Sequence, residues 1–152
     1  MEQEEKNLGE ANVVYDNTPT VVAVIVPKGY KTILMVRRGN EPKKGLLGLP
    51  GGYHMRGETW QMAGAREVYE ETGYVLTNPE AYMKLLSMET DEYGNNLVIA
   101  LWEGPTFLDS TWSPDPAETQ EVVFQDYHIR DTEFAFPRHW LAVKEYFAPG
   151  AV

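Results

Sequence analysis

The sequence has no cysteine, and this absence removes several kinds of chemistry at once. A chain without thiols has no disulfide bonds, no thiolate nucleophile and no zinc site with cysteine ligands. The three histidines, His54, His128 and His139, are too scattered to supply a zinc site in their place. We therefore interpret each histidine as a surface or packing residue.

Long apolar runs and a signal-like N-terminus are also missing. The longest apolar stretches, such as residues 21–26, are far shorter than the roughly 20 residues that span a bilayer. The N-terminal stretch MEQEEKNLGE is acidic and lacks the apolar centre of a secretory signal. We expect a cytoplasmic protein with no membrane association.

Basic side chains are scarce. The chain has 13 Lys and Arg against 23 Asp and Glu, which gives a formal net charge of -10. This balance argues against general binding to nucleic acid, which normally shows as a basic patch or stripe. An acidic protein can still bind a small polyphosphate if bound cations supply the positive charge.

The most informative stretch that is present covers residues 52–74 and reads GYHMRGETWQMAGAREVYEETGY. Glu67, Glu70 and Glu71 lie at positions i, i+3 and i+4, so an α-helix would place their carboxylates on one face. Gly73 is typical of the residue after a helix C-terminus, where the helix dipole disfavours anions. Three carboxylates at that point form either a solvated acidic face or a socket for divalent cations such as Mg²⁺.

The residues that precede this helix favour the socket. The turn Pro50-Gly51-Gly52 has a backbone that can approach a ligand closely, and a glycine-rich entry to a helix exposes amide donors suited to phosphate. Arg66 lies among the glutamates and can pair with Glu58. Such a pair would hold the loop against the helix.

These fixed positions resemble the signature of the Nudix hydrolase superfamily. In order they are Gly52, Glu58, Arg66-Glu67, the aliphatic Val68, Glu70-Glu71, Gly73 and Tyr74, which replaces the family's usual aliphatic residue. So many residue types at fixed spacing make a specific motif. The order of expected elements along the chain is also similar to the Nudix fold. The resemblance therefore implies an α+β fold (α/β/α sandwich) with a mixed β-sheet between helices.

The resemblance also implies a reaction, in which water attacks one phosphorus of a nucleoside diphosphate linked to another moiety. Mg²⁺, or Mn²⁺ in its place, would be the cofactor, and a small-molecule nucleotide the partner. The implied metal ligands are Glu67, Glu70 and Glu71, with a backbone carbonyl from Gly51 or Gly52. Arg66 and Glu58 would mainly orient these groups, and Gly73 would end the helix.

The base that deprotonates water is open. In the family it is a motif glutamate or an acidic residue on a later loop, and Glu118 and Glu121 are the candidates here. Glu121 matches the family's placement better, because it directly precedes the apolar residues 122–124. Its other interpretation is an exposed charge that begins a strand. The expected catalytic set comprises Arg66, Glu67, Glu70, Glu71 and Glu121.

Substrate choice lies outside the motif. Arg37 and Arg38, with two lysines farther along the loop of residues 39–48, could neutralise substrate phosphates or simply add solubility. Several aromatic side chains could stack on a base or belong to the core: Tyr53, Trp60, Tyr93, Trp102 and Trp112. We select Tyr53 with the two arginines as candidate substrate-binding residues.

The rest of the chain predicts one domain over residues 18–152, preceded by a loose or edge-adding arm at residues 1–17. Turn residues divide the domain into expected elements. They are paired strands at 20–26 and 31–38, a helix at 59–72, a hairpin of 81–89 with 96–102, a loop at 105–119, a strand at 121–124 and a helix from Pro137.

Two other functions compete with hydrolysis. The chain could be a non-catalytic nucleotide-binding sensor module, although such binders would be expected to lose motif carboxylates and here all are present. RNA decapping is disfavoured by the acidity and by the lack of a basic arm. Whether the protein acts as a homodimer is left open.

Overall fold

The computed structural model describes residues 14–148, so the prediction of an N-terminal arm at 1–17 lies mostly outside the described residues. In chain order the elements are β1 (Thr20–Ile25), β2 (Ile33–Arg38), β3 (Leu47–Gly48), β4 (Gly51–Tyr53), α1 (Trp60–Thr72), β5 (Tyr74–Val75), α2 (Pro79–Tyr82), β6 (Met83–Thr90), β7 (Asn96–Trp102), β8 (Phe107–Leu108), β9 (Thr119–Gln125), a 3-10 turn (Asp131–Glu133) and α3 (Pro137–Phe147).

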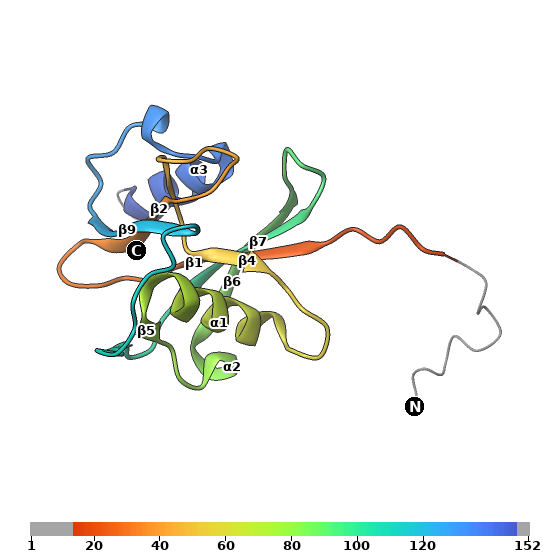
Figure 1. The fold of residues 1–152 in the computed structure, drawn as a ribbon, viewed down its shortest axis with the longest axis horizontal. Helices are drawn as coiled ribbons and strands as arrows, with labels where there is room; N and C mark the ends of the chain where they lie inside the picture. Colours follow the sequence, from red (N-terminus) through yellow and green to blue (C-terminus); the bar gives the residue numbers. More distant parts are fainter. Residues whose placement is uncertain (1–13, 149–152) are drawn as a thin grey trace.

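The main sheet has the strand order β4-β1-β7-β6, in which β1 and β7 are parallel and the other pairs are antiparallel. A second sheet has the order β3-β2-β9, and β5 pairs with β8. Helix α1 lies on one side of the main sheet and α3 on the other (Figure 1). The expected α+β class, with a mixed sheet between helices, is confirmed.

Strand β1 is the centre of this sandwich. Its alternate residues Val22 and Val24 pack in the core under α1, while Ala23 and Ile25 pack in the core under α3. All four are fully buried. A strand covered on both faces needs a continuous apolar run, which is why its sequence does not alternate with polar residues.

The predicted pairing of the first two strands is wrong. Both edges of β1 are occupied by β4 and β7, so β2 joins β3 and β9 in the second sheet. Only a bridge between Pro27 and Ile33, next to the turn, connects the two strands. The turn residues were identified correctly, but the sheet is decided by contacts distant in sequence.

Smaller corrections concern the hairpin and the loop that follows it. Residues 79–82 form the short helix α2, so the first hairpin strand begins at Met83 and not at residue 81. The expected loop at 105–119 contains β8, which pairs with β5 just after the motif helix. The last strand, expected at 121–124, begins two residues earlier, at Thr119.

Helix α1 follows the prediction closely. The Thr59 hydroxyl accepts a hydrogen bond from the Met62 backbone N–H at 3.1 Å, and Gly73 ends the helix in the left-handed region with φ of 80°. Gly64 contacts β1, where an added Cβ would lie 3.0 Å from the Val24 Cγ2 atom. This close approach explains a glycine inside a helix.

The buried face of α1 consists of Ala63, Gly64, Val68 and Thr72, whereas Met62 and Tyr69 are exposed. Helix α3 begins at Pro137 as expected, and its Val143 is fully buried. Among residues 14–148, no helix is long and apolar enough to cross a membrane.

Candidate active site

A cavity of about 710 Å³ lies next to β4 and the glutamate face of α1. It brings together several residues of the motif and several candidates from outside it. Those that line it are Arg38, Gly51, Gly52, Tyr53, Arg66, Glu67, Glu71, Tyr93 and Glu118. Arg37, Glu70 and Glu121 are not among the lining residues.

Gly51 and Gly52 allow close packing between β4, β1 and α1. A Cβ on Gly51 would overlap the Val22 carbonyl of β1, and a Cβ on Gly52 would overlap the Glu67 carboxylate. Only glycine therefore leaves room for the carboxylate of Glu67 directly against the β4 backbone. This contact sets the carboxylate beside backbone polar groups at one end of the cavity.

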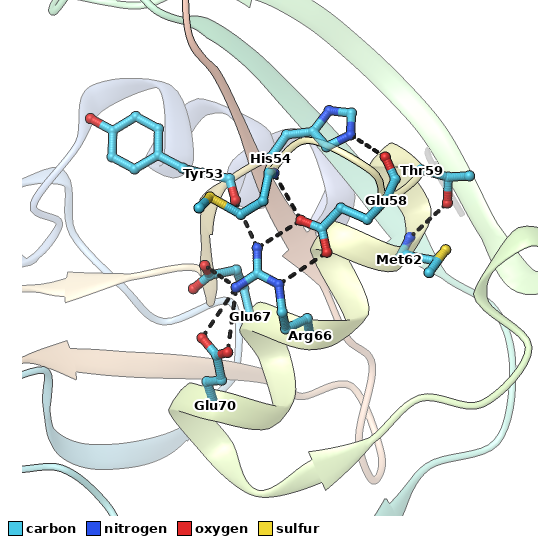
Figure 2. A network of polar contacts seen from close by, with 9 residues as sticks. Tyr53, His54, Glu58, Thr59, Met62, Arg66, Glu67 and Glu70 are labelled. Atoms are coloured by element: carbon cyan, nitrogen blue, oxygen red, sulfur yellow. Dashed lines mark hydrogen bonds and ion pairs between the residues drawn. The ribbon is translucent and has the colours of Figure 1, made fainter. Parts of the chain in front are cut away.

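Arg66 holds this end of the cavity together (Figure 2). Its Nε and Nη2 donate to the two carboxylate oxygens of Glu58 at 3.1 and 2.8 Å, and Nη2 also donates to the Tyr53 carbonyl at 2.8 Å. Nη1 donates to Glu67 at 2.9 Å and to Glu70 at 3.3 Å. The expected ion pair between Arg66 and Glu58 is therefore present, and it fastens the loop before α1 to the helix. The hydrogen bond from Arg66 also holds the pKa of Glu58 below its usual range.

Glu71 lies where a negative charge is unfavourable. Its Oε1 accepts a hydrogen bond from the Gly51 backbone N–H at 3.1 Å. Burial, with smaller contributions from the carboxylates of Glu67 and Glu118, raises its pKa to about 8. Burial likewise raises the pKa of Glu67, against the opposing effect of Arg66. A cation would relieve this crowding of carboxylates, so their oxygens fit a divalent metal ion.

The three motif glutamates converge less than their spacing predicted. Glu70 points its carboxylate to Arg66 and is 49% exposed, whereas Glu67 is 14% exposed. Within residues 14–148, no three carboxylate or imidazole groups form a ready metal-binding cluster. The reason is local: Arg66 lies between Glu67 and Glu70 and binds both, while Glu71 turns to the β4 backbone.

The two candidate bases occupy different places. Glu118 lines the cavity and lies close enough to Glu67 and Glu71 to raise their pKa values. Glu121 lies on β9, where its carboxylate accepts a hydrogen bond from Arg37 Nε at 3.0 Å. The same ion pair takes Arg37 away from the cavity, so Arg38 is the member of this pair of arginines that lines it.

Of the aromatic candidates, only the tyrosines line the cavity. Tyr53 and Tyr93 line the cavity and are 54% and 52% exposed. Trp102 is buried in the core and Trp60 packs against it. Trp112 donates its indole N–H to the Glu70 carbonyl at 3.2 Å, outside the cavity lining.

Nothing in the sequence assigned His139 and Phe136 to the site, although both line the cavity. His139 on α3 is buried, and its Nδ1 accepts a hydrogen bond from the Leu49 backbone N–H at 3.1 Å. Burial lowers its pKa to about 4. Phe136, just before α3, packs edge to face on His139, with ring centroids 4.9 Å apart. No local pattern marks either residue, because α3 reaches the cavity only through the tertiary fold.

Comparison with known proteins agrees with this geometry. The family model for the NUDIX domain matches residues 16–150. The chain belongs to the NUDIX domain family. Part of this NUDIX domain, 62 residues or 41% of the chain, is 42% identical to an ADP-ribose pyrophosphatase from Methanocaldococcus jannaschii, and the match covers 36% of that relative.

Solved structures with low sequence identity share the fold. The NUDIX domain of Shewanella oneidensis NrtR, solved as a complex with ADP ribose, superposes with a TM-score of 0.66 at 21% identity, over 95% of each chain. A bifunctional NMN adenylyltransferase/ADP ribose pyrophosphatase from Francisella tularensis, solved with AMP and a manganese ion, gives a TM-score of 0.63 at 21% identity. It covers 95% of this chain, which spans 45% of that protein.

Proposed function

We propose that this NUDIX domain protein is a metal-dependent hydrolase of the pyrophosphate linkage in a nucleoside diphosphate joined to another moiety. The observation that carries the proposal is the end of the cavity where Glu67 lies against Gly52 and Glu71 accepts from the Gly51 N–H, with the Glu118 carboxylate near enough to raise the pKa of both. Partly burying several carboxylates together costs desolvation energy and mutual repulsion, and a bound cation would offset both.

Glu67 and Glu71 are the residues proposed to hold the cation, together with a backbone carbonyl of Gly51 or Gly52. Glu70 would join them by leaving Arg66, a change that its half-exposed side chain permits. When bound, Mg²⁺ or Mn²⁺ orients the phosphates and neutralises the charge that develops on them. The donor set consists of hard oxygen atoms, which both ions accept.

Each remaining side chain has a role that follows from its place. Arg66 keeps Glu58, Glu67 and the β4 backbone in fixed positions, so it is a positioning residue. Glu118 is our choice of general base, because its carboxylate lines the cavity beside the other two. Glu121, which matched the family's placement better, would have to leave its ion pair with Arg37 to take this role.

The proposed substrate is a nucleotide or nucleotide derivative that carries a diphosphate. ADP-ribose is the first compound to test, because relatives of this chain are named for its hydrolysis or bind it. Arg38 and Tyr53 line the same cavity and are proposed to contact this substrate. Arg37 is proposed only as the partner of Glu121. The proposed compartment is the cytoplasm.

The test is a phosphate-release screen with a coupled phosphatase, in Mg²⁺ and in Mn²⁺. The panel contains ADP-ribose, NADH, nucleoside triphosphates, dinucleoside polyphosphates and nucleotide sugars. Turnover that stops with excess chelator supports the proposal. Tight binding of a panel compound, with no turnover in either metal, would instead favour the sensor function.

A further inference from the structure

Strand β6 forms one edge of the main sheet, and its outer side is open in the part of the chain that the structure describes. Its sheet neighbour is β7, on the inner side. Among residues 14–148, residues 84–90 make no backbone hydrogen bond outside the ladder with β7. Their outward N–H and C=O groups are therefore available to a further strand.

The side chains along this edge are unusually apolar for an open strand. Leu85, Leu86 and Met88 are 51%, 43% and 64% exposed. Proteins normally protect an edge strand with charges or with proline. Strand β6 has no proline, and its charged residues are Lys84 and Glu89. An exposed apolar edge of this kind indicates contact with another polypeptide.

A β-bulge between Leu85 and Ser87 decides which of these side chains share a face. Lys84 and Glu89 lie opposite β7 residues that pack toward α3, so both point to the α3 face. Leu85 and Met88 lie opposite β7 residues that pack toward α1. In a regular strand, residues three or five positions apart point to opposite faces. The bulge therefore gives the edge one charged face and one apolar face.

This arrangement is complementary to a second copy of itself. Two β6 strands that run antiparallel about a two-fold axis at the bulge place Lys84 of one copy opposite Glu89 of the other. The same register places Leu85 opposite Met88 of the other copy. Each pair shares a face of the sheet and occurs twice by symmetry. Opposite charges and apolar side chains directly across two strands both stabilise the pairing.

The two charged side chains are available for this contact. The Lys84 side chain makes no ion pair or hydrogen bond within residues 14–148. Glu89 is held at the edge by an ion pair between its Oε1 atom and Arg138 of α3. Its Oε2 atom makes no hydrogen bond in the same range. A carboxylate held in this way can accept from a second cation, so the lysine of the other copy would join an existing pair.

A groove behind the edge favours the same contact. It has a volume of about 570 Å³ and lies between β6, β7 and α3. Leu86 lines it together with Leu141 of α3, which is 52% exposed. A strand added along β6 would remove part of this apolar surface from water, which stabilises the association. Within residues 14–148, the groove shares no lining residue with the active-site cavity.

From these observations we infer that the protein forms a two-fold symmetric homodimer through its β6 strands. The pairing joins the two main sheets into one continuous sheet, and the second copy is the partner that the open edge accepts. Dimerisation does not depend on the proposed function, because it uses the groove and not the active-site cavity.

The first experiment measures the mass of the full-length chain by sedimentation equilibrium over a range of concentrations. The unchanged protein is expected to form a species of twice the chain mass, and amide exchange at residues 84–90 should slow as it forms. Met88→Lys places a lysine opposite Leu85 of the other copy and should raise the dimer dissociation constant about tenfold or more. Tyr127→Lys, at a tyrosine 60% exposed beyond the end of β9, is the control and should dimerise as the unchanged protein does.

A charge exchange tests the register. Lys84→Glu alone, or Glu89→Lys alone, places like charges opposite each other twice in each homodimer, so each should weaken dimerisation about tenfold. A mixture of the two variants restores opposite charges at both places and should form a mixed dimer with nearly the unchanged affinity. This recovery distinguishes antiparallel β6 pairing from any other contact that needs either residue.

A monomer at every concentration up to about 500 µM would overturn the inference. In such a monomer, slow amide exchange at residues 84–90 would show that another part of the same chain covers the edge instead. A dimer that Met88→Lys does not weaken would also overturn it, because the copies would then meet elsewhere. So would a mixture of the two charge variants that stays monomeric.

Discussion

Glu71 is the residue whose surroundings most strongly disfavour its charge. Its folded-state pKa of about 8 lies above the ordinary value of 4.5, so the folded protein binds a proton that the unfolded chain releases between these values. In the metal-free protein, the contribution of Glu71 to stability is therefore lost as pH rises from about 4.5 to 8. The loss is on the order of 4 kcal/mol across the window.

Glu71→Gln should remove this loss, because glutamine keeps an oxygen for the Gly51 N–H and carries no charge. We expect the variant to be more stable than the unchanged metal-free protein at pH 8.5 and similar to it at pH 5, by urea unfolding. Glu145→Gln, on the exposed surface of α3, serves as the control and should follow the unchanged protein. Parallel pH curves for Glu71→Gln and the unchanged protein would contradict this account.

His139 has the opposite dependence on pH. Its folded-state pKa of about 4 lies below the ordinary 6.5, so the unfolded chain takes up a proton first as pH falls. The contribution of His139 to stability is fully present above pH 6.5 and is lost as pH falls toward 4, by roughly 3 kcal/mol. His139→Asn should lack this contribution, so its unfolding free energy should rise less between pH 4 and 6.5 than that of the unchanged protein. His128→Asn, at a histidine 70% exposed, is the comparison that should keep the slope.

At the scale of elements, the loop before α1 and the helix itself depend on Arg66. This guanidinium makes hydrogen bonds to the Glu58 carboxylate, the Tyr53 carbonyl, Glu67 and Glu70. Lysine cannot reproduce these contacts, because its ammonium group lacks the planar, forked set of donors. Arg66→Lys should cost about 2 kcal/mol in urea unfolding and reduce turnover, because the loop and Glu67 lose their common anchor.

Arg37→Lys is a matched control for this prediction. Arg37 makes one ion pair, to Glu121, and donates from Nη1 to the Gly45 carbonyl at 3.1 Å; the Arg37 and Glu121 side chains are 37% and 59% exposed. Such a pair contributes under about 1 kcal/mol, so the lysine variant should be nearly neutral. If the two variants were equally stable, Arg66 would not organise the site.

The elements also show which information is local. The helix predicted at 59–72, observed at 60–72, has its glutamate spacing and its glycine stop within one segment. The neighbours of β1 could not be predicted, because three other strands compete for its two edges and only the complete core decides among them. The same limit kept β8 hidden in a proline-rich segment.

The site divides in the same way. Glu67, Glu71 and the two glycines were predicted because the motif keeps them on adjacent elements. The place of Glu118 relative to Glu121 depends on how β9 pairs with β2, which the sequence does not encode locally. His139 and Phe136 line the cavity from the α3 side of the main sheet, opposite to the motif helix α1. A lone histidine and a lone phenylalanine give no signal of such a position.

At the scale of the whole molecule, the formal net charge of -10 makes a bound cation favourable for the folded state. Mg²⁺ at ten times its dissociation constant should add about 1.4 kcal/mol to the free energy of unfolding, by mass action. For a chain of this size that is a rise in Tm of roughly 4 °C. Scanning calorimetry with Mg²⁺ and with excess chelator measures it, and Glu71→Gln should abolish the rise. If Mg²⁺ does not change the Tm, the carboxylates form a solvated acidic face and not a metal site.

The most direct test of the central claim is hydrolysis of ADP-ribose, or of the best compound in the screen, in water enriched in ¹⁸O. Mass spectrometry of the products then reports which bond is cleaved. The account predicts one ¹⁸O atom on a single phosphate product, no reaction with excess chelator, and a rate at least about a hundredfold lower for Glu71→Gln. Cleavage that continues in chelator, that leaves ¹⁸O off phosphorus, or that proceeds unchanged in Glu71→Gln would contradict it.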